Sequence, residues 1–153
     1  MAKLVLKDTD ELKEYLGAEL GTSDWHLVTQ KEINLFADAT GDHQWIHVDV
    51  ERAKRESPYK GPIAHGYYTL SLTPVLMAQI FEVTEKKMGI NYGAEKVRFP
   101  APVPVGKKVR MKASLASIQD IEGGVQANFQ VTFEVEGQPK PACVAEVVYR
   151  YYI

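Results

Sequence analysis

The sequence predicts an α+β domain in which a curved antiparallel sheet wraps around one buried helix. Residues 61–81 contain no Asp, Glu, Lys or Arg, although 25% of the chain is charged. After this segment, the chain reads as long strands in which apolar and polar side chains alternate. A helix that is apolar nearly all round must be covered, and a run of antiparallel strands can curl around it.

Length and composition favour one domain and argue against some partners. A chain of 153 residues predicts a single domain, residues 1–153, with a helical extension at residues 1–27. The net charge of −2 provides no positive field for nucleic acid. The single cysteine, Cys143, reads as a small buried hydrophobe. The opening segment has only a short apolar stretch, which predicts no signal peptide and a cytoplasmic location.

Two short helices are predicted before the apolar segment. A capping box at residues 8–11 starts a surface helix that Gly17 can end. A brief extended segment at residues 25–28 leads to a second capping box, Thr29 to Glu32, and a helix over about 30–39. Gly41 supplies the left-handed residue that ends many helices. The charged residues 51–57 form one or two solvated helical turns.

The apolar segment predicts a central helix over residues 66–88. Leu72, Leu76 and Ile80 recur at helical spacing. Pro74 removes a backbone donor, so the helix should bend there or begin its regular part near it. A membrane span is the competing interpretation, but the run holds several polar residues and its apolar part falls short of the ~20 residues a bilayer needs. We therefore predict no membrane partner.

The second half of the chain alternates with the period of strands. A phase slip at residues 116–118 predicts a bulge, and Glu122-Gly123-Gly124 predicts a hairpin turn. The final strand is partly apolar on both faces, so it should lie inside the sheet. The predicted strands span residues 94–99, 108 to the turn at 122–124, 125–136 and 142–153.

Asp42 and His47 are the first candidates for chemistry, because they follow a helix end and sit beside two large apolar residues. Trp45 and Ile46 could hold the carboxylate and the imidazole in a low-dielectric pocket, where a water between them is activated. The alternative is ordinary turn chemistry with a packed histidine.

His65 and Gly66 form a second candidate, at the start of the buried helix. A helix N-terminus presents free N–H groups, and glycine lets a carbonyl oxygen approach the backbone. Such a site can stabilise an oxyanion. The alternative is a helix start that needs no side chain.

A metal site can also be drawn from the acidic and imidazole side chains of this region. They lack a recognised ligand spacing, so we predict no metal. The set comprises Asp42, His43, His47, Asp49 and His65.

Three motifs in order resemble the MaoC-like dehydratase family, which includes the (R)-specific enoyl-CoA hydratases. They are FADATGDHQWIH at residues 36–47, GPIAHG at 61–66 and VRFPAPV at 97–103. The resemblance covers roughly residues 28–153. Gln44-Trp45 replaces the Asn-Pro that the family usually has, which is similar to the nodulation protein N-like branch.

The resemblance implies a hot-dog fold and a homodimer, or a dimer of dimers, with sheets joined edge to edge. Asp42 and His47 match the catalytic pair, and Gly66 matches the glycine whose N–H binds the thioester oxygen. His65 and Trp45 would complete the substrate site. The implied reaction is reversible addition of water to a trans-2-enoyl thioester, with coenzyme A as part of the substrate and no cofactor.

Several questions stay open after the resemblance. A hot-dog thioesterase would polarise the same carbonyl but attack its carbon, and a non-catalytic acyl-CoA-binding subunit could keep the fold alone. Acyl chain length and the choice between coenzyme A and an acyl-carrier protein are not predicted. Five basic residues could attract the phosphates of coenzyme A or simply form a solvent-exposed strand face. These are Arg98, Lys107, Lys108, Arg110 and Lys112.

Overall fold

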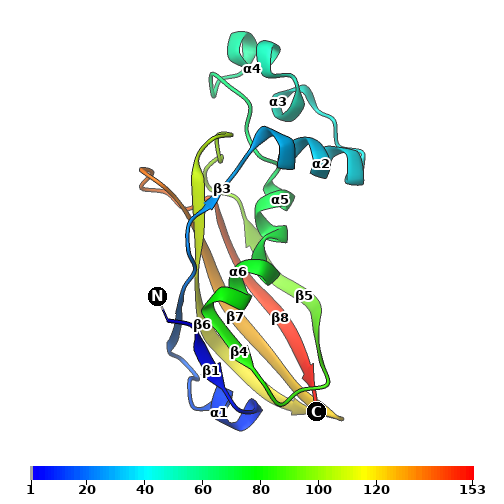
Figure 1. Ribbon diagram of the computed structural model, residues 1–153, viewed down its shortest axis with the longest axis vertical. Coiled ribbons are helices and arrows are strands. Elements are labelled where there is room, and N and C mark those ends of the chain that lie inside the picture. The colour runs from blue at the N-terminus through cyan, green and yellow to red at the C-terminus, as the bar shows by residue number, and fades with distance from the viewer. Residues whose placement is uncertain (1) are drawn as a thin grey trace.

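The computed structural model, which describes residues 2–153, shows a curved antiparallel sheet with helices along its concave face (Figure 1). The large sheet has the order β2-β6-β7-β8-β5, and β3 also pairs with β6. Its strands are β2 (Glu19–Thr22), β3 (His26–Leu27), β5 (Met88–Arg98), β6 (Lys108–Ile121), β7 (Gly124–Val135) and β8 (Cys143–Tyr152). This confirms the predicted α+β architecture.

The alternation of apolar and polar side chains sets the register of the central strands. Along β7 every second residue is buried, so a slip of one residue would expose the whole core face. The predicted bulge is confirmed by a register shift between Leu115 and Ser117. Gly123 has φ 82° in the hairpin turn, and β8 lies between β7 and β5 as predicted.

The predicted central helix is correct in place but wrong in extent. Two helices, α5 (Gly66–Ser71) and α6 (Thr73–Ile80), meet at Leu72. Pro74 occupies the first turn of α6, where the missing N–H costs no helical hydrogen bond. The chain then becomes extended in β4 (Phe81–Val83), which pairs in parallel with β1 (Leu4–Leu6). Pairing with β1 outweighs the local helical pattern.

The N-terminal region is more extended than predicted. Only α1 (Thr9–Lys13) is helical, and its N-cap Asp8 accepts a hydrogen bond from the Glu11 N–H. The predicted helical extension at residues 1–27 is otherwise wrong, because β2 and β3 pair with the open edge of β6. Strand β5 likewise begins at Met88, earlier than the strand predicted over residues 94–99, and its first residues pair with β8.

Three helices lie beyond one end of the sheet, at the top of Figure 1. They are α2 (Gln30–Thr40), α3 (Trp45–Val48) and α4 (Val50–Glu56). Gly41 ends α2 with φ 83°, as predicted. Within residues 2–153, no helix combines the length and the apolar character needed to cross a membrane.

The main core fills the space between α6 and the concave face of the sheet. Phe129, Phe133 and Leu115 are fully buried there with Leu76 of α6. Cys143 is buried in the same core, and burial raises the pKa of its thiol to about 12. This confirms the interpretation of Cys143 as a small hydrophobe.

Candidate active site

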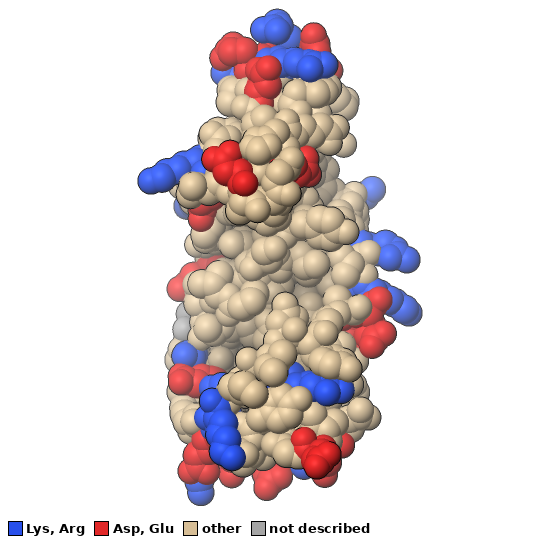
Figure 2. All heavy atoms as spheres, turned by 90° about the vertical axis from the view of Figure 1, so that its right-hand side faces the viewer, with Lys and Arg blue, Asp and Glu red and all other residues tan. Residues whose placement is uncertain are grey.

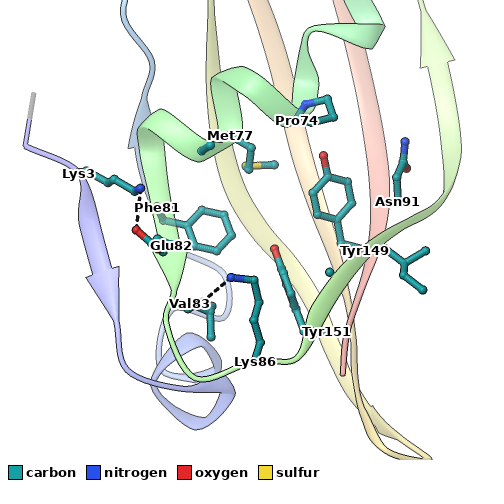
Figure 3. A pocket seen from close by; sticks show the side chains of 13 residues that line it. Lys3, Pro74, Met77, Phe81, Glu82, Val83, Lys86, Asn91, Tyr149 and Tyr151 are labelled. Carbon is teal, nitrogen blue, oxygen red and sulfur yellow. Dashed lines mark hydrogen bonds and ion pairs between the residues drawn. The ribbon is translucent and has the colours of Figure 1, made fainter. Parts of the chain in front are cut away.

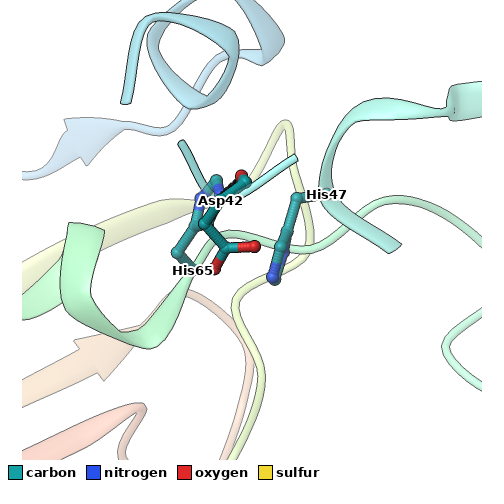
Figure 4. Close-up of side chains that lie close together, drawn as sticks. All are labelled: Asp42, His47 and His65. Carbon is teal, nitrogen blue, oxygen red and sulfur yellow. Dashed lines mark hydrogen bonds between the residues drawn. The ribbon is translucent and has the colours of Figure 1, made fainter. Parts of the chain in front are cut away.

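The loop between α2 and α3 meets the start of α5 and forms one cluster. A carboxylate oxygen of Asp42 and ring nitrogens of His47 and His65 lie within 4.8 Å of one another (Figure 4). A cavity of about 260 Å³ beside the cluster is lined by both His47 and Gly66. The structure therefore brings the predicted pair next to the predicted helix start.

Backbone contacts fix the orientation of His47. Its Nδ1–H donates a hydrogen bond to the Ile63 carbonyl oxygen at 2.7 Å, which leaves Nε2 as the acceptor of the neutral ring. The Gln30 side chain donates to the His47 carbonyl at 2.8 Å. These two bonds hold the short helix α3 against α2 and the Ile63 strand segment.

The electrostatic surroundings keep the His47 imidazole neutral. Burial lowers its pKa below the ordinary histidine value, and the nearby His65 ring lowers it further. The Ile63 carbonyl and the Asp42 carboxylate oppose this shift but do not reverse it. At neutral pH, His47 therefore offers a free lone pair as a proton acceptor.

His65 holds the Asp42 loop against the helix. Its Nε2–H donates to the Asp42 main-chain carbonyl at 3.0 Å. Its ring stacks on His47 with centroids 3.9 Å apart, and the Phe36 ring lies 4.9 Å away. The side chain is 3% exposed and does not line the cavity beside Gly66. We predicted a substrate contact for His65; in the structure its ring contacts the Asp42 carbonyl and the His47 ring instead of the cavity.

The surroundings of Asp42 differ from the prediction. Its side chain is exposed, and one carboxylate oxygen accepts a hydrogen bond from the Gln44 N–H at 3.3 Å. Trp45 does not line the cavity, and the Arg52 guanidinium lies 4.3 Å from its ring. The reason is geometric: Trp45 and His47 belong to one helical turn, so their side chains point about 200° apart around its axis.

Gly66 begins α5, so its N–H belongs to the first turn and has no intrahelical partner. A Cβ at this position would lie 3.0 Å from the Phe99 ring, which is closer than side chains normally approach. We predicted that glycine leaves room for a substrate carbonyl. The structure adds that glycine also leaves room for Phe99, which forms the facing wall of the cavity.

Several cavity residues were not predicted as site residues. Phe99 and Pro102 belong to the motif at residues 97–103. The sequence pointed to this motif but did not predict that its residues line the cavity. Tyr59 and Thr69 line the same cavity, and nothing in their local sequence distinguishes them. Tyr59 reaches the site through the path of the chain between α4 and α5, and Thr69 lies within α5, one turn after Gly66.

Two of the five basic residues are engaged on the outer face of the sheet. Arg110 and Lys112 form ion pairs with Glu134 at 2.7 and 3.2 Å, and Arg110 also lies 4.4 Å from the Trp25 ring. For these two residues, a solvent-exposed face of the sheet is the better interpretation. Arg98 directly precedes the cavity residue Phe99, which keeps it a candidate for a phosphate contact.

The cluster geometry suits proton transfer better than metal binding. The His47 and His65 rings are stacked with an interplanar angle of 26°, and the lone pairs of imidazole lie in the ring planes. Nearly parallel lone pairs do not converge on one ion, whereas metal ligands must.

Comparison with solved structures identifies the fold. The chain superimposes on "(R)-hydratase from A. caviae involved in PHA biosynthesis" with a TM-score of 0.70 at 22% identity, over 84% of this chain and 92% of that one. The fold is the hot dog, as the resemblance implied.

Sequence similarity then shows the family. Residues 11–136 match the model of the MaoC like domain. The chain is 56% identical over 142 residues to "3-hydroxyacyl-thioester dehydratase Z" of Mycobacterium tuberculosis, covering 92% of this chain and 93% of that protein. It is 44% identical to "Nodulation protein N" of Rhizobium meliloti, covering 95% and 89%. The chain belongs to the MaoC-like dehydratase family, and it is an enzyme of the hydro-lyase class.

Proposed function

We propose that the protein catalyses reversible addition of water to trans-2-enoyl thioesters, giving (R)-3-hydroxyacyl thioesters. The observation that carries this proposal is the neutral His47 beside the Asp42 carboxylate, at the edge of a cavity shared with Gly66. The relative named 3-hydroxyacyl-thioester dehydratase Z supports the substrate class.

The pair of Asp42 and His47 handles the proton in this mechanism. A water held between the carboxylate and Nε2 loses a proton to the pair as its oxygen bonds to C3 of the substrate. The pair then returns one proton to C2, so the net change is one water added. Two acceptors within 4.8 Å of each other can share that water, and the low pKa of His47 keeps it ready to accept.

The Gly66 N–H stabilises the charge that develops on the thioester oxygen. Attack at C3 moves electrons to this oxygen as an enolate forms, so a fixed donor helps the transition state more than the substrate. Loss of one such donor typically costs ~3 kcal/mol of barrier. No cofactor is required by this scheme.

Crotonyl-CoA hydration tests the proposal. The intact protein should deplete the enoyl thioester without releasing free thiol, while Asp42→Asn and His47→Ala should each lose at least ~100-fold in rate. His43→Gln is the matched control, because His43 lies in the same loop but is bonded to the exposed Asp38. Wild-type rates in both site variants would refute the site. Thiol release would identify a thioesterase, and binding without turnover would identify a binding subunit.

We also propose that two copies join through β5. This strand is an edge of the large sheet, and Met88, Ile90 and Tyr92 are 52%, 39% and 56% exposed. Figure 2 shows the face on this side of the molecule, where a broad central band carries no charged side chain. An edge strand that exposes large apolar side chains along its first half is a ready pairing site for a second strand.

Light scattering on the eluting protein tests the dimer. The wild type should have the mass of two chains, or of four chains if two dimers associate. The double variant Ile90→Lys, Tyr92→Lys should have a lower mass. Leu35→Lys is the control, since Leu35 is 58% exposed on α2. A wild-type monomer at micromolar concentration would contradict this part.

The carrier and the location are further parts of the proposal. We propose coenzyme A as the carrier, with Arg98, which directly precedes the cavity residue Phe99, as a phosphate contact, and a cytoplasmic location. Comparing kcat/KM for the same acyl group on coenzyme A and on an acyl-carrier protein tests the carrier. Arg98→Gln should raise KM for the coenzyme A form alone, and cell fractionation tests the location.

A further inference from the structure

Three hollows follow successive turns of the helices α5 and α6. Gly66 and Thr69 line the active-site cavity, while Leu70 and Thr73 line a second hollow of about 230 Å³. Met77, together with Pro74, lines a third of about 400 Å³. We call the second and third hollows the lower groove.

The two hollows of the lower groove adjoin each other beside β5 and β8, because Asn91 of β5 and Tyr149 of β8 line both of them. Figure 3 shows the Tyr149 ring rising from β8 between Asn91 and the residues of α6, Pro74 and Met77. An acyl chain whose thioester lies at Gly66 would run along this face of the helices and reach Tyr149.

The hydroxyl of Tyr149 has no hydrogen-bond partner among the described residues. The side chain is only 9% exposed, and burial raises the pKa of the phenol to about 12, so it keeps its proton. A buried hydroxyl without a partner costs free energy. Phenylalanine would fill the same space without this cost, so the oxygen calls for an explanation.

In the part of the chain that the structure describes, the second hollow has no charged residue in its lining, which favours a neutral ligand oxygen beside Tyr149. The charged groups of the lower groove lie at the third hollow, where Lys3 forms an ion pair with Glu82 at 2.7 Å. There the Lys86 ammonium donates to the Val83 carbonyl at 2.6 Å. The Tyr149 hydroxyl and the Asn91 amide are neutral groups that can bond a hydroxyl or a ketone oxygen.

We propose that Tyr149 is a specificity-determining residue, whose hydroxyl binds an oxygen atom carried on the acyl chain. This inference rests on the proposed function. The preferred substrates are then enoyl thioesters whose chain bears a hydroxyl or keto group at the carbon that reaches Tyr149. A plain alkyl chain of the same length leaves the buried hydroxyl unpaired, and the site discriminates against it.

A positional series of substrates tests this inference. The series consists of enoyl-CoA thioesters of one chain length, each with a keto or hydroxyl group at a different carbon of the acyl chain. For each compound, kcat/KM is compared with that of the unsubstituted acyl chain of the same length. The wild type should show a maximum at one position, with a preference of about 10-fold. Tyr149→Phe should abolish that preference. Tyr152→Phe is the matched control, because Tyr152 lies on the same strand and does not line the groove.

The possible failures separate the two proposals. Equal oxygen preference in the wild type and in Tyr149→Phe, with both plain and substituted chains hydrated, would overturn this inference and leave the hydratase intact. If no enoyl thioester is hydrated, the proposed function is wrong. The inference about Tyr149 is then tested by calorimetric binding of saturated acyl-CoA, with and without an oxygen on the acyl chain. Tighter binding of the oxygen-bearing chain that is lost in Tyr149→Phe supports the inference. Equal binding of the two chains by the wild type overturns it.

Discussion

The sheet with its core and the active-site end are stabilised in different ways. In the sheet, apolar side chains such as Phe129 and Phe133 are fully buried, and three long strands share extended ladders. At the active-site end, the short helix α3 and the Asp42 loop depend on single hydrogen bonds from His47, His65 and Gln30.

This difference separates stability from chemistry. Changes in the sheet act through packing and should unfold the protein, whereas changes at the active-site end should misplace a few polar atoms in a chain that still folds. Each prediction below tests whether the two regions can be disturbed independently.

Removing a large core side chain should have the largest effect on stability. Phe129 is 0% exposed and packs against Phe81 and Tyr149. Phe129→Ala should lower the free energy of unfolding by about 3–5 kcal/mol, measured by urea denaturation. Phe99→Ala is the matched control, because the Phe99 ring is 41% exposed, and it should cost much less. Similar losses in both would contradict the division between the regions.

A methyl group at the start of α5 should impair activity and spare the fold. In Gly66→Ala the new Cβ would meet the Phe99 ring at 3.0 Å, so the ring must shift, and with it one wall of the cavity. We expect kcat/KM for crotonyl-CoA to fall on the order of 10- to 100-fold, because small misplacements at a reacting centre are costly. The melting temperature should change little.

A second substitution sharpens this test. Phe99→Leu added to Gly66→Ala gives the methyl group room and should restore part of the lost activity. No recovery in the double variant would show that Phe99 is not the cause of the loss.

Two substitutions of His65 should separate its bond from its stacking. His65→Phe keeps an aromatic ring against His47 but leaves the Asp42 carbonyl without its donor, and His65→Gln keeps a donor without the ring. Loss of the bond should cost about 1 kcal/mol of stability and lower kcat in the phenylalanine variant. His26→Phe is a control outside the cluster. A wild-type kcat in both His65 variants would remove its positioning role.

The smallest expected effect is the pH dependence set by His47. Its pKa is lowered in the folded protein, so the acid limb of kcat/KM should lie below the ordinary histidine value of about 6.5. The unfolded chain binds this proton more readily, so the contribution of His47 to stability is present above that value and is lost as the pH falls. An acid limb above the ordinary value would contradict the neutral His47.

The sequence predicted the sheet better than the ends of its elements. Alternation in residues 125–135 specified β7 and its register, because one face had to be buried. The helix end at Ile80 and the strand Phe81–Val83 could not be predicted, because they depend on pairing with Leu4–Leu6, far away in sequence. The same holds for β2 and β3, which find their partner in β6.

At the site, residue types were predictable and neighbours were not. Asp42, His47 and Gly66 were proposed from motif and helix signals, and the structure brings their elements together. The Ile63 carbonyl that orients His47 and the Phe99 ring against Gly66 come from other segments. Their contribution follows from the path of the chain, which local sequence does not encode.

The parallel pairing between Leu4–Leu6 and Phe81–Val83 has a practical consequence. Lys3, which directly precedes the first of these strands, and Glu82 of its partner strand line the hollow beside Met77. A shortened chain that starts after Leu6 would lose Lys3 from the lining of this hollow and leave Phe81–Val83 without its partner strand. The acyl-chain preference of such a trimmed protein should therefore differ from that of the full chain.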